Sequence, residues 1–467
     1  KFKIKMKIEK INNKNIFIFG LGISGMSLAK FLKNKVNNLF CWDDNLIIRK
    51  KGVKAGLNLK SVESLNFSSL DYLVLSPGIN HRLKTPHLVV SEALKKKVKI
   101  TTDLEFLKIL KIKNFLIGVT GTNGKSTTTK FIEKSLMFSR SKCITFGNIG
   151  IPFGDVVSNL QKTDILLAEV SSFQLDKIIN LKFDISILLN LSKDHIEWHG
   201  GWNEYLKSKF KIFENQDKNC FAIVCIDDKN SNELAKNFNK KYKSKLIKIS
   251  IKRKLIDGIF LEEKENMLVI VNNLNKTKIF IEKHKLLFTK AHHNYQNLLA
   301  TYASYFLLKK NNLSFLKSIY RLKNLEHRLE LVIRVKNICV FNDSKSTNIN
   351  AAKNAINSFQ NIYWILGGRK KKDGINGIQN NLNKILKAFT FGEAGSEFNE
   401  FLKKKNVDSK KYKSLESALE NALKEGFREK AEINILFSPA CSSFDQFKNF
   451  EQRGRCFKKY LKKILKK

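Results

Sequence analysis

The sequence lacks long apolar runs and closely paired cysteines. No run of about 18 uncharged apolar residues is present, which is the least that a membrane-spanning helix needs, so we expect no membrane insertion. The seven cysteines are scattered and include no C-x-x-C pair, which argues against both a disulfide framework and a zinc site. The basic start of the chain leads into a short apolar run that ends at Gly20, which is not a secretory signal pattern. These absences predict a cytoplasmic protein with reduced thiols.

Acidic residues are also scarce relative to basic ones. The chain has 42 Asp and Glu residues against 86 Lys and Arg residues, a formal net charge of +44. A clustered excess of this kind would suit a nucleic-acid partner, because lysine and arginine neutralise phosphates. Here the lysines are spread along the chain, and no basic-aromatic module is present. We therefore expect no nucleic-acid partner, although the charge can attract anionic nucleotide substrates.

Proline is rare, with four residues, and no Gly/Ser-rich linker marks a domain boundary. A chain of 467 residues nevertheless exceeds what one hydrophobic core usually serves. Short β-branched or aromatic runs recur, each followed by a polar loop and a helical pattern, which is typical of α/β units with parallel sheets. Ligands bind beyond the carboxyl ends of such strands. The polar loops that follow the runs lie at 20–25, 76–78, 120–126, 169–172, 190–195, 342–348 and 438–443.

The strongest motif runs from Gly118 to Ser126 and reads G-V-T-G-T-N-G-K-S. It follows an apolar run and precedes a helical pattern. In that setting a glycine-rich turn lets backbone N–H groups approach phosphate oxygens, Lys125 reaches the terminal phosphates, and Ser126 can ligate Mg²⁺. Val119 stands where the strict phosphate-loop pattern has its first glycine. The motif predicts ATP binding.

A second glycine loop, Gly20 to Gly25, fits G-x-G-x-x-G, and Asp43 and Asp44 follow the next apolar run. Alone, this pattern is a dinucleotide fingerprint and would suggest an NAD-dependent dehydrogenase. The same loop can hold the diphosphate of any nucleotide-linked substrate, with an acid at its ribose or base, or it can be a tight turn without a ligand. The dehydrogenase interpretation leaves the loop from Gly118 to Ser126 unexplained.

Three short polar segments of the middle region contain one candidate residue each: Glu169, His195 and Lys209. Phosphoryl transfer needs metal ions to neutralise charge, so an acid and an imidazole near a phosphate loop are candidate ligands. Each residue also has an ordinary structural interpretation: a glutamate that ends a strand, a histidine in a core, a lysine on the surface.

Taken together, these motifs resemble the Mur ligase family. The phosphate loop is common to all Mur ligases and to folylpolyglutamate synthases. More particular segments are G-N-I-G at 147–150, S-S-F-Q-L at 171–175, N-D-S-K-S-T-N at 342–348 and S-P-A-C-S-S-F-D-Q-F-K-N-F-E-Q-R-G at 438–454. These last segments resemble the branch of the family that adds D-glutamate. They differ from the branches that add L-alanine, a diamino acid or a dipeptide, and from the enzymes that add glutamate to folate.

The resemblance implies an α/β fold of three domains. They are an N-terminal Rossmann-like domain for the UDP-linked substrate (1–100), a central P-loop-type ATPase domain (101–325) and a C-terminal Rossmann-like domain for the amino acid (326–467). The implied activity is ligation of D-glutamate to UDP-N-acetylmuramoyl-L-alanine through an acyl phosphate, with ATP and two Mg²⁺ ions. This reaction belongs to peptidoglycan synthesis, and so to cell-wall biogenesis, cell shape and cell division. A cytoplasmic monomer is expected.

The resemblance also assigns site residues. The catalytic residues are Lys125, His195 and Lys209, and Lys209 is expected to be carbamylated by CO₂. The metal ligands are Ser126, Glu169, His195 and Lys209. ATP is expected at Gly121, Thr122, Asn123, Gly124, Lys125, Ser126, Thr127, Asn294, Asn297, Arg328 and Asp343. The UDP-linked substrate and D-glutamate are expected at Gly22, Ile23, Ser24, Asp43, Asp44, Ser76, Asn148, Lys345, Thr347, Lys371, Ser443, Phe444 and Phe450.

One segment departs from the family pattern. The family has G-G-x-x-K-x-x-D after a C-terminal strand, whereas this chain has Gly367 to Asp373, which is one residue shorter. Lys371 is the expected amino-acid-binding lysine, and Lys370 and Lys372 remain alternatives.

Overall fold

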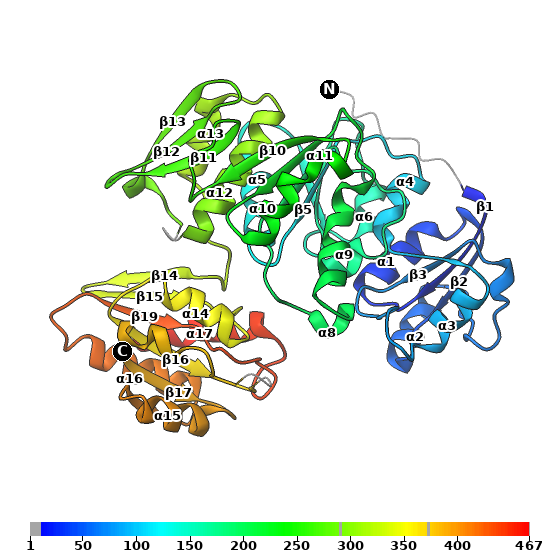
Figure 1. The fold of residues 1–467 in the computed structure, drawn as a ribbon. Helices are drawn as coiled ribbons and strands as arrows, with labels where there is room; N and C mark the ends of the chain where they lie inside the picture. Colours follow the sequence, from blue (N-terminus) through cyan, green and yellow to red (C-terminus); the bar gives the residue numbers. More distant parts are fainter. Residues whose placement is uncertain (1–10, 289–291, 371–373, 467) are drawn as a thin grey trace. The chain divides into compact units, whose positions relative to one another are not determined.

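The computed structural model describes residues 11–288, 292–370 and 374–466 (Figure 1). The chain divides into two compact units, one of Lys1–Lys283 with Tyr295–Ile319 and the other of His284–Asn294 with Tyr320–Lys467. Three separate sheets confirm the predicted α/β class, while the exact domain boundaries stay a prediction. Among the described residues, no helix is both long enough and apolar enough to cross a membrane.

The first unit begins with a four-stranded parallel sheet in the order β2-β1-β3-β4. Its strands are β1 (Ile11–Phe19), β2 (Val36–Trp42), β3 (Tyr72–Leu75) and β4 (Lys99–Thr101). Its helices are α1 (Ile23–Leu32), α2 (Leu46–Lys54) and α3 (Leu88–Lys95). The end of β1 is fully apolar and buried on both faces, as expected of a parallel strand covered by helices. The loops after β1 and β3 therefore meet at one edge of the sheet.

The same unit contains a nine-stranded sheet in the order β13-β12-β11-β10-β9-β8-β5-β7-β6. Its strands are β5 (Leu116–Thr120), β6 (Cys143–Gly147), β7 (Ile165–Glu169), β8 (Ile185–Leu188), β9 (Phe221–Cys225), β10 (Lys245–Ser250), β11 (Gly258–Glu263), β12 (Met267–Asn272) and β13 (Thr277–Glu282). The pairs from β6 to β11 are parallel, and β12 and β13 add an antiparallel edge. Because β5 lies between β7 and β8, the loops after these three strands are neighbours.

Helices that accompany this sheet are α4 (Phe106–Ile109), α5 (Lys125–Phe138), α6 (Phe153–Ser158), α7 (Ser172–Leu175), α8 (Ile196–His199), α9 (Trp202–Glu214), α10 (Lys229–Lys236), α11 (Phe238–Lys241), α12 (His292–Leu307) and α13 (Asn312–Ile319). Short 3₁₀ helices lie at Phe67–Ser69, Asp103–Glu105, Lys283–Lys285 and Gln379–Lys384.

The second unit has a six-stranded sheet in the order β14-β15-β19-β16-β17-β18, in which only β14 runs antiparallel to its neighbour. Its strands are β14 (Glu330–Val335), β15 (Ile338–Asn342), β16 (Ile362–Gly367), β17 (Ile385–Phe391), β18 (Asp408–Lys411) and β19 (Ile433–Phe437). Its helices are α14 (Ile349–Ile356), α15 (Gly395–Lys404), α16 (Leu415–Gly426) and α17 (Phe450–Ile464). Apolar cores lie on both faces of the sheet, as in a doubly wound fold.

Candidate active site

The phosphate loop connects β5 to α5 and has the backbone that its glycines allow. Gly121 and Gly124 adopt φ values of +151° and +85°, a region that strains other residues. A Cβ atom on Gly124 would also lie 2.4 Å from Oδ1 of Asn297. Lys125 Nζ donates hydrogen bonds to the carbonyl oxygens of Gly121 at 2.8 Å and Thr122 at 2.9 Å. The lysine amine thus lies over the loop at the amino end of a helix, where a phosphate is favoured.

Two residues outside the motif hold this loop in place. Asn190, in the loop after β8, accepts from Thr122 N at 2.9 Å through its main-chain oxygen and from Asn123 N at 2.8 Å through its side chain. The hydroxyl of Tyr205 on α9 lies 2.7 Å from Thr122 Oγ1. Sequence reasoning included Asn190 only as part of a polar loop and assigned it no role. Its contact with the phosphate loop follows from the pairing of β8 with β5, and a sequence motif does not show which strands pair.

The remaining nucleotide-side residues of this region lie on α5 and α12. Ser126 and Thr127 are buried in the first turn of α5. Asn297 is buried, and its Oδ1 accepts from Thr128 Oγ1 at 3.1 Å. Asn294 lies three residues earlier on α12 and donates through Nδ2 to Asn324 Oδ1 at 3.3 Å.

Glu169 ends β7, between β5 and β6, and is 1% exposed. Asn148 Nδ2 donates to its Oε1 at 2.8 Å, and Asn148 N donates to its main-chain oxygen at 2.8 Å. Its Oε2 is buried and has no hydrogen-bond partner among the described residues. A buried carboxylate oxygen without a partner is costly. With the Ser126 hydroxyl at the start of α5, the donor set fits Mg²⁺, which prefers oxygen ligands.

Lys209 lies on α9 and is buried, with 2% of its surface exposed. Its Nζ donates to Gly121 O at 3.0 Å and to Thr120 Oγ1 at 3.4 Å. Burial first, and then the charge of Lys125, lower the pKa of Lys209 well below the ordinary value for lysine. Lys207, two residues earlier, is 67% exposed and pairs with Glu204. The structure thus distinguishes Lys209, which reaches the phosphate loop, from a surface lysine on the same helix.

His195 precedes α8 and adopts φ +51°, in the left-handed region that few residues other than glycine occupy. Its ring is about half exposed. Nε2 lies 3.4 Å from Asp194 Oδ2, and the ring centre lies 4.9 Å from that of Phe173. Phe173 also packs on Trp198 and His199, so His195 borders an aromatic cluster beside α7.

The loop after β1 needs its glycines, because a Cβ atom on Gly25 would lie 2.0 Å from Gly20 O. Asp43 holds this loop: its Oδ2 accepts from Leu21 N at 2.7 Å and its Oδ1 from Asn45 N at 2.8 Å. Asp44 is 65% exposed and lies 3.2 Å from His87 Nε2. The two acids therefore differ: Asp43 has a structural task, and Asp44 is accessible to a ligand.

The other predicted residues of this edge surround the same loop. Gly22 is the N-cap of α1, and space for a side chain is open there. Ile23 is 80% exposed, an unusual state for isoleucine, and Ser24 is half-buried. Ser76 follows β3 and borders Gly20, whose added Cβ would lie 2.5 Å from Ser76 Cβ. The structure brings these residues together.

In the second unit, Asp343 follows β15 and accepts from Leu329 N at 3.1 Å and from Ser438 Oγ at 2.8 Å. Burial raises the pKa of Asp343 to about 7, although both hydrogen bonds oppose the shift. Lys345 Nζ lies 3.9 Å from the ring centre of Phe450. Arg328 and Thr347 are half-buried, Ser443 is buried and Phe444 is exposed. Lys371 and Lys372 lie outside the described residues, and Lys370 pairs with Glu397.

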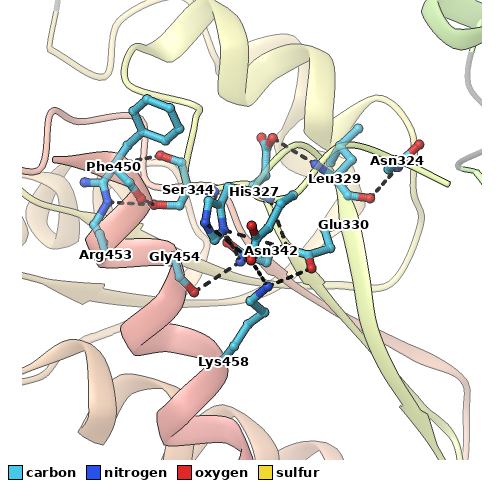
Figure 2. A network of polar contacts seen from close by, with 12 residues as sticks. Asn324, His327, Leu329, Glu330, Asn342, Ser344, Phe450, Arg453, Gly454 and Lys458 are labelled. Atoms are coloured by element: carbon cyan, nitrogen blue, oxygen red, sulfur yellow. Dashed lines mark hydrogen bonds and ion pairs between the residues drawn. The ribbon is translucent and has the colours of Figure 1, made fainter. Parts of the chain in front are cut away.

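Arg453 on α17 joins two of these loops, and its contact with Ser344 is shown in Figure 2. It is fully buried, and burial lowers its pKa to about 10. Its guanidinium donates to Ser344 Oγ at 3.1 Å, to Ser344 O at 2.9 Å, to Cys441 O at 3.0 Å and to Ser442 O at 3.2 Å. The sequence places Arg453 in the motif at 438–454 but indicates no role for it. The missing information was its burial between two loops.

A second cluster shown in Figure 2 has the ligand types of a metal site but already contains a cation. Carboxylate and imidazole atoms of Glu326, His327 and Glu330 lie within 4.8 Å of one another. Lys458 Nζ donates to Glu326 and, at 3.0 Å, to Glu330. The ammonium group supplies the positive charge that a metal ion would bring.

Comparison with known proteins adds the following similarities. Residues 119–305 match the model of the Mur ligase middle domain. The UDP-N-acetylmuramoylalanine–D-glutamate ligase of Rickettsia prowazekii (strain Madrid E) is 36% identical over 454 residues, covering 96% of this chain and 98% of the relative. The enzyme of the same name from Wolbachia pipientis wMel is 32% identical, covering 97% of each chain.

Solved structures are similar in fold. UDP-N-acetylmuramate-alanine ligase MurC from Thermotoga maritima has a TM-score of 0.59 at 16% identity, covering 96% of this chain and 99% of that one. MurF ligase from Thermotoga maritima in complex with ADP has a TM-score of 0.57 at 16% identity, covering 97% and 96%.

Proposed function

The chain belongs to the Mur ligase family, and we propose that it joins D-glutamate to UDP-N-acetylmuramoyl-L-alanine with ATP through an acyl phosphate. It is an ATP-dependent acid–amino-acid ligase of peptidoglycan precursor synthesis. The observation that carries the proposed substrates is the match to relatives named for this reaction over nearly the whole length of both chains. We place the enzyme in the cytoplasm as a monomer, with a role in cell shape and division.

The reaction needs activation because a carboxylate is a poor electrophile. In the proposed first step, the carboxylate of UDP-N-acetylmuramoyl-L-alanine attacks the γ-phosphate of ATP, and ADP leaves. The phosphate loop and Lys125 bind and align the phosphates, which is the main task of a protein in phosphoryl transfer. Ser126 and Glu169 would hold Mg²⁺, which would neutralise charge on the phosphates. The buried second oxygen of Glu169 supports this assignment, since it has no hydrogen-bond partner among the described residues.

In the proposed second step, the amine of D-glutamate attacks the acyl phosphate, an amide bond forms, and phosphate leaves. We assign D-glutamate to Lys345, Thr347, Lys371, Ser443, Phe444 and Phe450 in the C-terminal domain, 326–467. The cation of Lys345 and the main-chain arrangement fixed by Arg453 support a carboxylate site there. Arg328 and Asp343 are assigned to the nucleotide, as are Asn294 and Asn297 of the central domain, 101–325.

The UDP moiety is assigned to the N-terminal domain, 1–100, at Gly22, Ile23, Ser24, Asp43, Asp44 and Ser76. Within this set the exposed carboxylate of Asp44 is suited to a ribose or base contact, while Asp43 holds the loop. Asn148 and His195 are assigned to the muramoyl substrate, and His195 also to the metal.

Lys209 is proposed to be carbamylated. Its neutral amine adds to the carbon of CO₂ and loses a proton, which gives an anionic carbamate suited to a metal ion. Two features support this: its pKa lies well below the ordinary lysine value, and its Nζ lies beside the phosphate loop. An ammonium group there would instead repel Mg²⁺.

The test is phosphate release by the purified enzyme. Release is expected only when UDP-N-acetylmuramoyl-L-alanine, ATP, Mg²⁺ and D-glutamate are all present, and omission of any one should abolish it. Replacing D-glutamate by L-alanine, a diamino acid or D-alanyl-D-alanine should give little release. Faster turnover with one of these would overturn the assignment. Saturable NADH binding in a fluorescence titration would instead revive the dehydrogenase interpretation of the first glycine loop.

A further inference from the structure

Arg82 connects the N-terminal sheet to two helices beside the central sheet. It lies in the segment after β3. Its Nε and Nη2 donate to the two carboxylate oxygens of Asp176, each at 2.6 Å, and its Nη1 donates to Glu204 Oε2 at 2.7 Å. The side chain of Asp176 is fully buried, whereas Arg82 and Glu204 are about one-third exposed. A bidentate bond to a buried carboxylate has a fixed geometry.

The two residues before Arg82 strengthen the same connection. Asn80 Nδ2 donates to Trp198 O at 2.8 Å, and His81 Nε2 lies 3.4 Å from Asp176 Oδ2. Burial lowers the pKa of His81 to about 4, so this ring is neutral near pH 7. Burial opposes ionisation of Asp176 too, but the hydrogen bonds from Arg82 still hold its pKa below the ordinary value. Arg82, unlike His81, therefore brings a permanent positive charge to the carboxylate of Asp176.

Both carboxylates belong to segments that also carry the phosphoryl-transfer residues. Asp176 directly follows α7, seven residues after Glu169. Glu204 lies on α9, next to Tyr205, whose hydroxyl contacts the phosphate loop, and five residues before Lys209. Lys211 of α9 donates to Asp176 O at 2.7 Å, which ties the two segments together. On the other side, Arg82 shares a loop with Ser76.

We infer that Arg82 is a positioning residue of the ligase reaction: it fixes the loop assigned to the UDP-linked substrate against the segment that follows Glu169 and the helix that carries Lys209. The inference rests on the proposed function. Arg82 is not a catalytic residue, since both its acceptors are protein carboxylates. Its effect is alignment of the UDP-linked substrate with the γ-phosphate of ATP, and an error of about 1 Å in such an alignment can cost about 100-fold in rate.

An arginine is required for both contacts at once. The planar guanidinium can make two parallel bonds to Asp176 while its third nitrogen reaches Glu204. A lysine has a single nitrogen and cannot reproduce that fork. Arg82→Lys should therefore retain the charge and only part of the alignment, whereas Arg82→Gln should lose both.

The experiment is steady-state phosphate release by wild type, Arg82→Gln, Arg82→Lys and Glu204→Gln, with thermal melting of each variant. Lys142→Ala is the matched control, because Lys142 also pairs with a fully buried aspartate, Asp164, at 2.9 Å. We expect kcat of Arg82→Gln to fall about 100-fold, with KM for ATP little changed. Arg82→Lys should fall between that variant and wild type, and Lys142→Ala should lose melting temperature without losing kcat.

Glu204→Gln keeps the bond between Arg82 and Asp176 and tests the α9 contact if Arg82→Gln does not fold; we expect a drop in kcat of about 10-fold. The inference is overturned if every folded variant of Arg82 and Glu204 keeps a kcat within twofold of wild type, or if kcat falls only as the folded fraction does. An inactive wild type would count against the proposed function, whereas an active wild type with equally active variants would count against the role of Arg82 alone.

Discussion

Lys209 Nζ donates to the main-chain oxygen of Gly121 at 3.0 Å, and Lys125 Nζ donates to that same oxygen at 2.8 Å. Two ammonium groups at one acceptor would repel each other, and Lys209 is the more deeply buried of the two. The less costly arrangement is a cationic Lys125 at the phosphate position and a neutral Lys209 beneath it. A neutral amine is also the form that reacts with CO₂.

Lys209→Ala should therefore be nearly inactive, because it removes the amine that is proposed to form the carbamate. Acetate should restore part of the activity by placing a small carboxylate in the space that the lysine leaves. Lys207→Ala, on the same helix but exposed, should remain active. Phosphate release with and without acetate is the measurement, and full activity of Lys209→Ala in carbonate-depleted buffer would end the carbamate hypothesis.

The sequence predicted local features well. The glycines of the phosphate loop, the strand before it and the helix after it all lie within a few residues, so one motif specifies them. The sequence also predicted that Glu169 follows an apolar strand; it ends β7, which pairs with β5, the strand before the phosphate loop. Each polar loop predicted from the sequence follows a strand of the structure, as expected; these strands are β1, β3, β5, β7, β8, β15 and β19.

Contacts between residues that are far apart in the sequence could not be predicted in this way. Asp43 is predicted, with Asp44, to bind the UDP moiety, and the sequence did not indicate that its oxygens accept the main-chain N–H groups of Leu21 and Asn45. Arg82 lies 94 residues from Asp176, and Arg453 lies 109 residues from Ser344. These pairs depend on which strands are neighbours and on which helix packs where. A single sequence contains no short pattern that shows which of two distant residues will contact each other.

Lys125→Ala should abolish turnover and leave binding of UDP-N-acetylmuramoyl-L-alanine nearly unchanged. Lys125 donates to carbonyl oxygens of the phosphate loop, and the UDP moiety is assigned to a different sheet. Calorimetric titration of the variant with the UDP-linked substrate, beside an assay of ATP turnover, is the measurement. Loss of UDP-substrate affinity with retained ATP turnover would reverse the domain assignments.

Asp343 makes stability depend on pH. Its folded pKa is raised to about 7, above the value near 4 of an unfolded aspartate, so between these values the folded chain holds a proton that the unfolded chain has lost. The contribution of Asp343 to the stability of the wild type should thus fall as pH rises from about 4 to about 7. Asp343→Asn lacks this term, so its stability relative to wild type should rise over that window, by about 4 kcal/mol at most.

Urea unfolding at several pH values measures this difference. Asp44→Asn is the control for the substitution itself, because the side chain of Asp44 is 65% exposed. Parallel stability curves for wild type and Asp343→Asn would show that the buried carboxyl is not protonated in the folded chain.

Arg453→Lys should destabilise the second unit and weaken D-glutamate binding. The guanidinium satisfies four acceptors on the loops at Ser344 and at Cys441 and Ser442, and one ammonium group cannot reach them all. Each buried acceptor left without a donor costs about 1–3 kcal/mol, so a loss of about 3 kcal/mol or more in unfolding free energy is expected. Because these loops lead into Lys345 and Ser443, KM for D-glutamate should rise more than KM for ATP.

The matched control is Arg455→Lys, the same substitution two residues further along α17 at an exposed position. A surface change of this kind should stay within about 0.5 kcal/mol of wild type, with both KM values unchanged. Urea unfolding and steady-state kinetics of the two variants give the comparison. Equal stability of Arg453→Lys and Arg455→Lys would mean that the loops hold their shape without the arginine, whereas lower stability with an unchanged KM for D-glutamate would place the amino-acid site away from these loops.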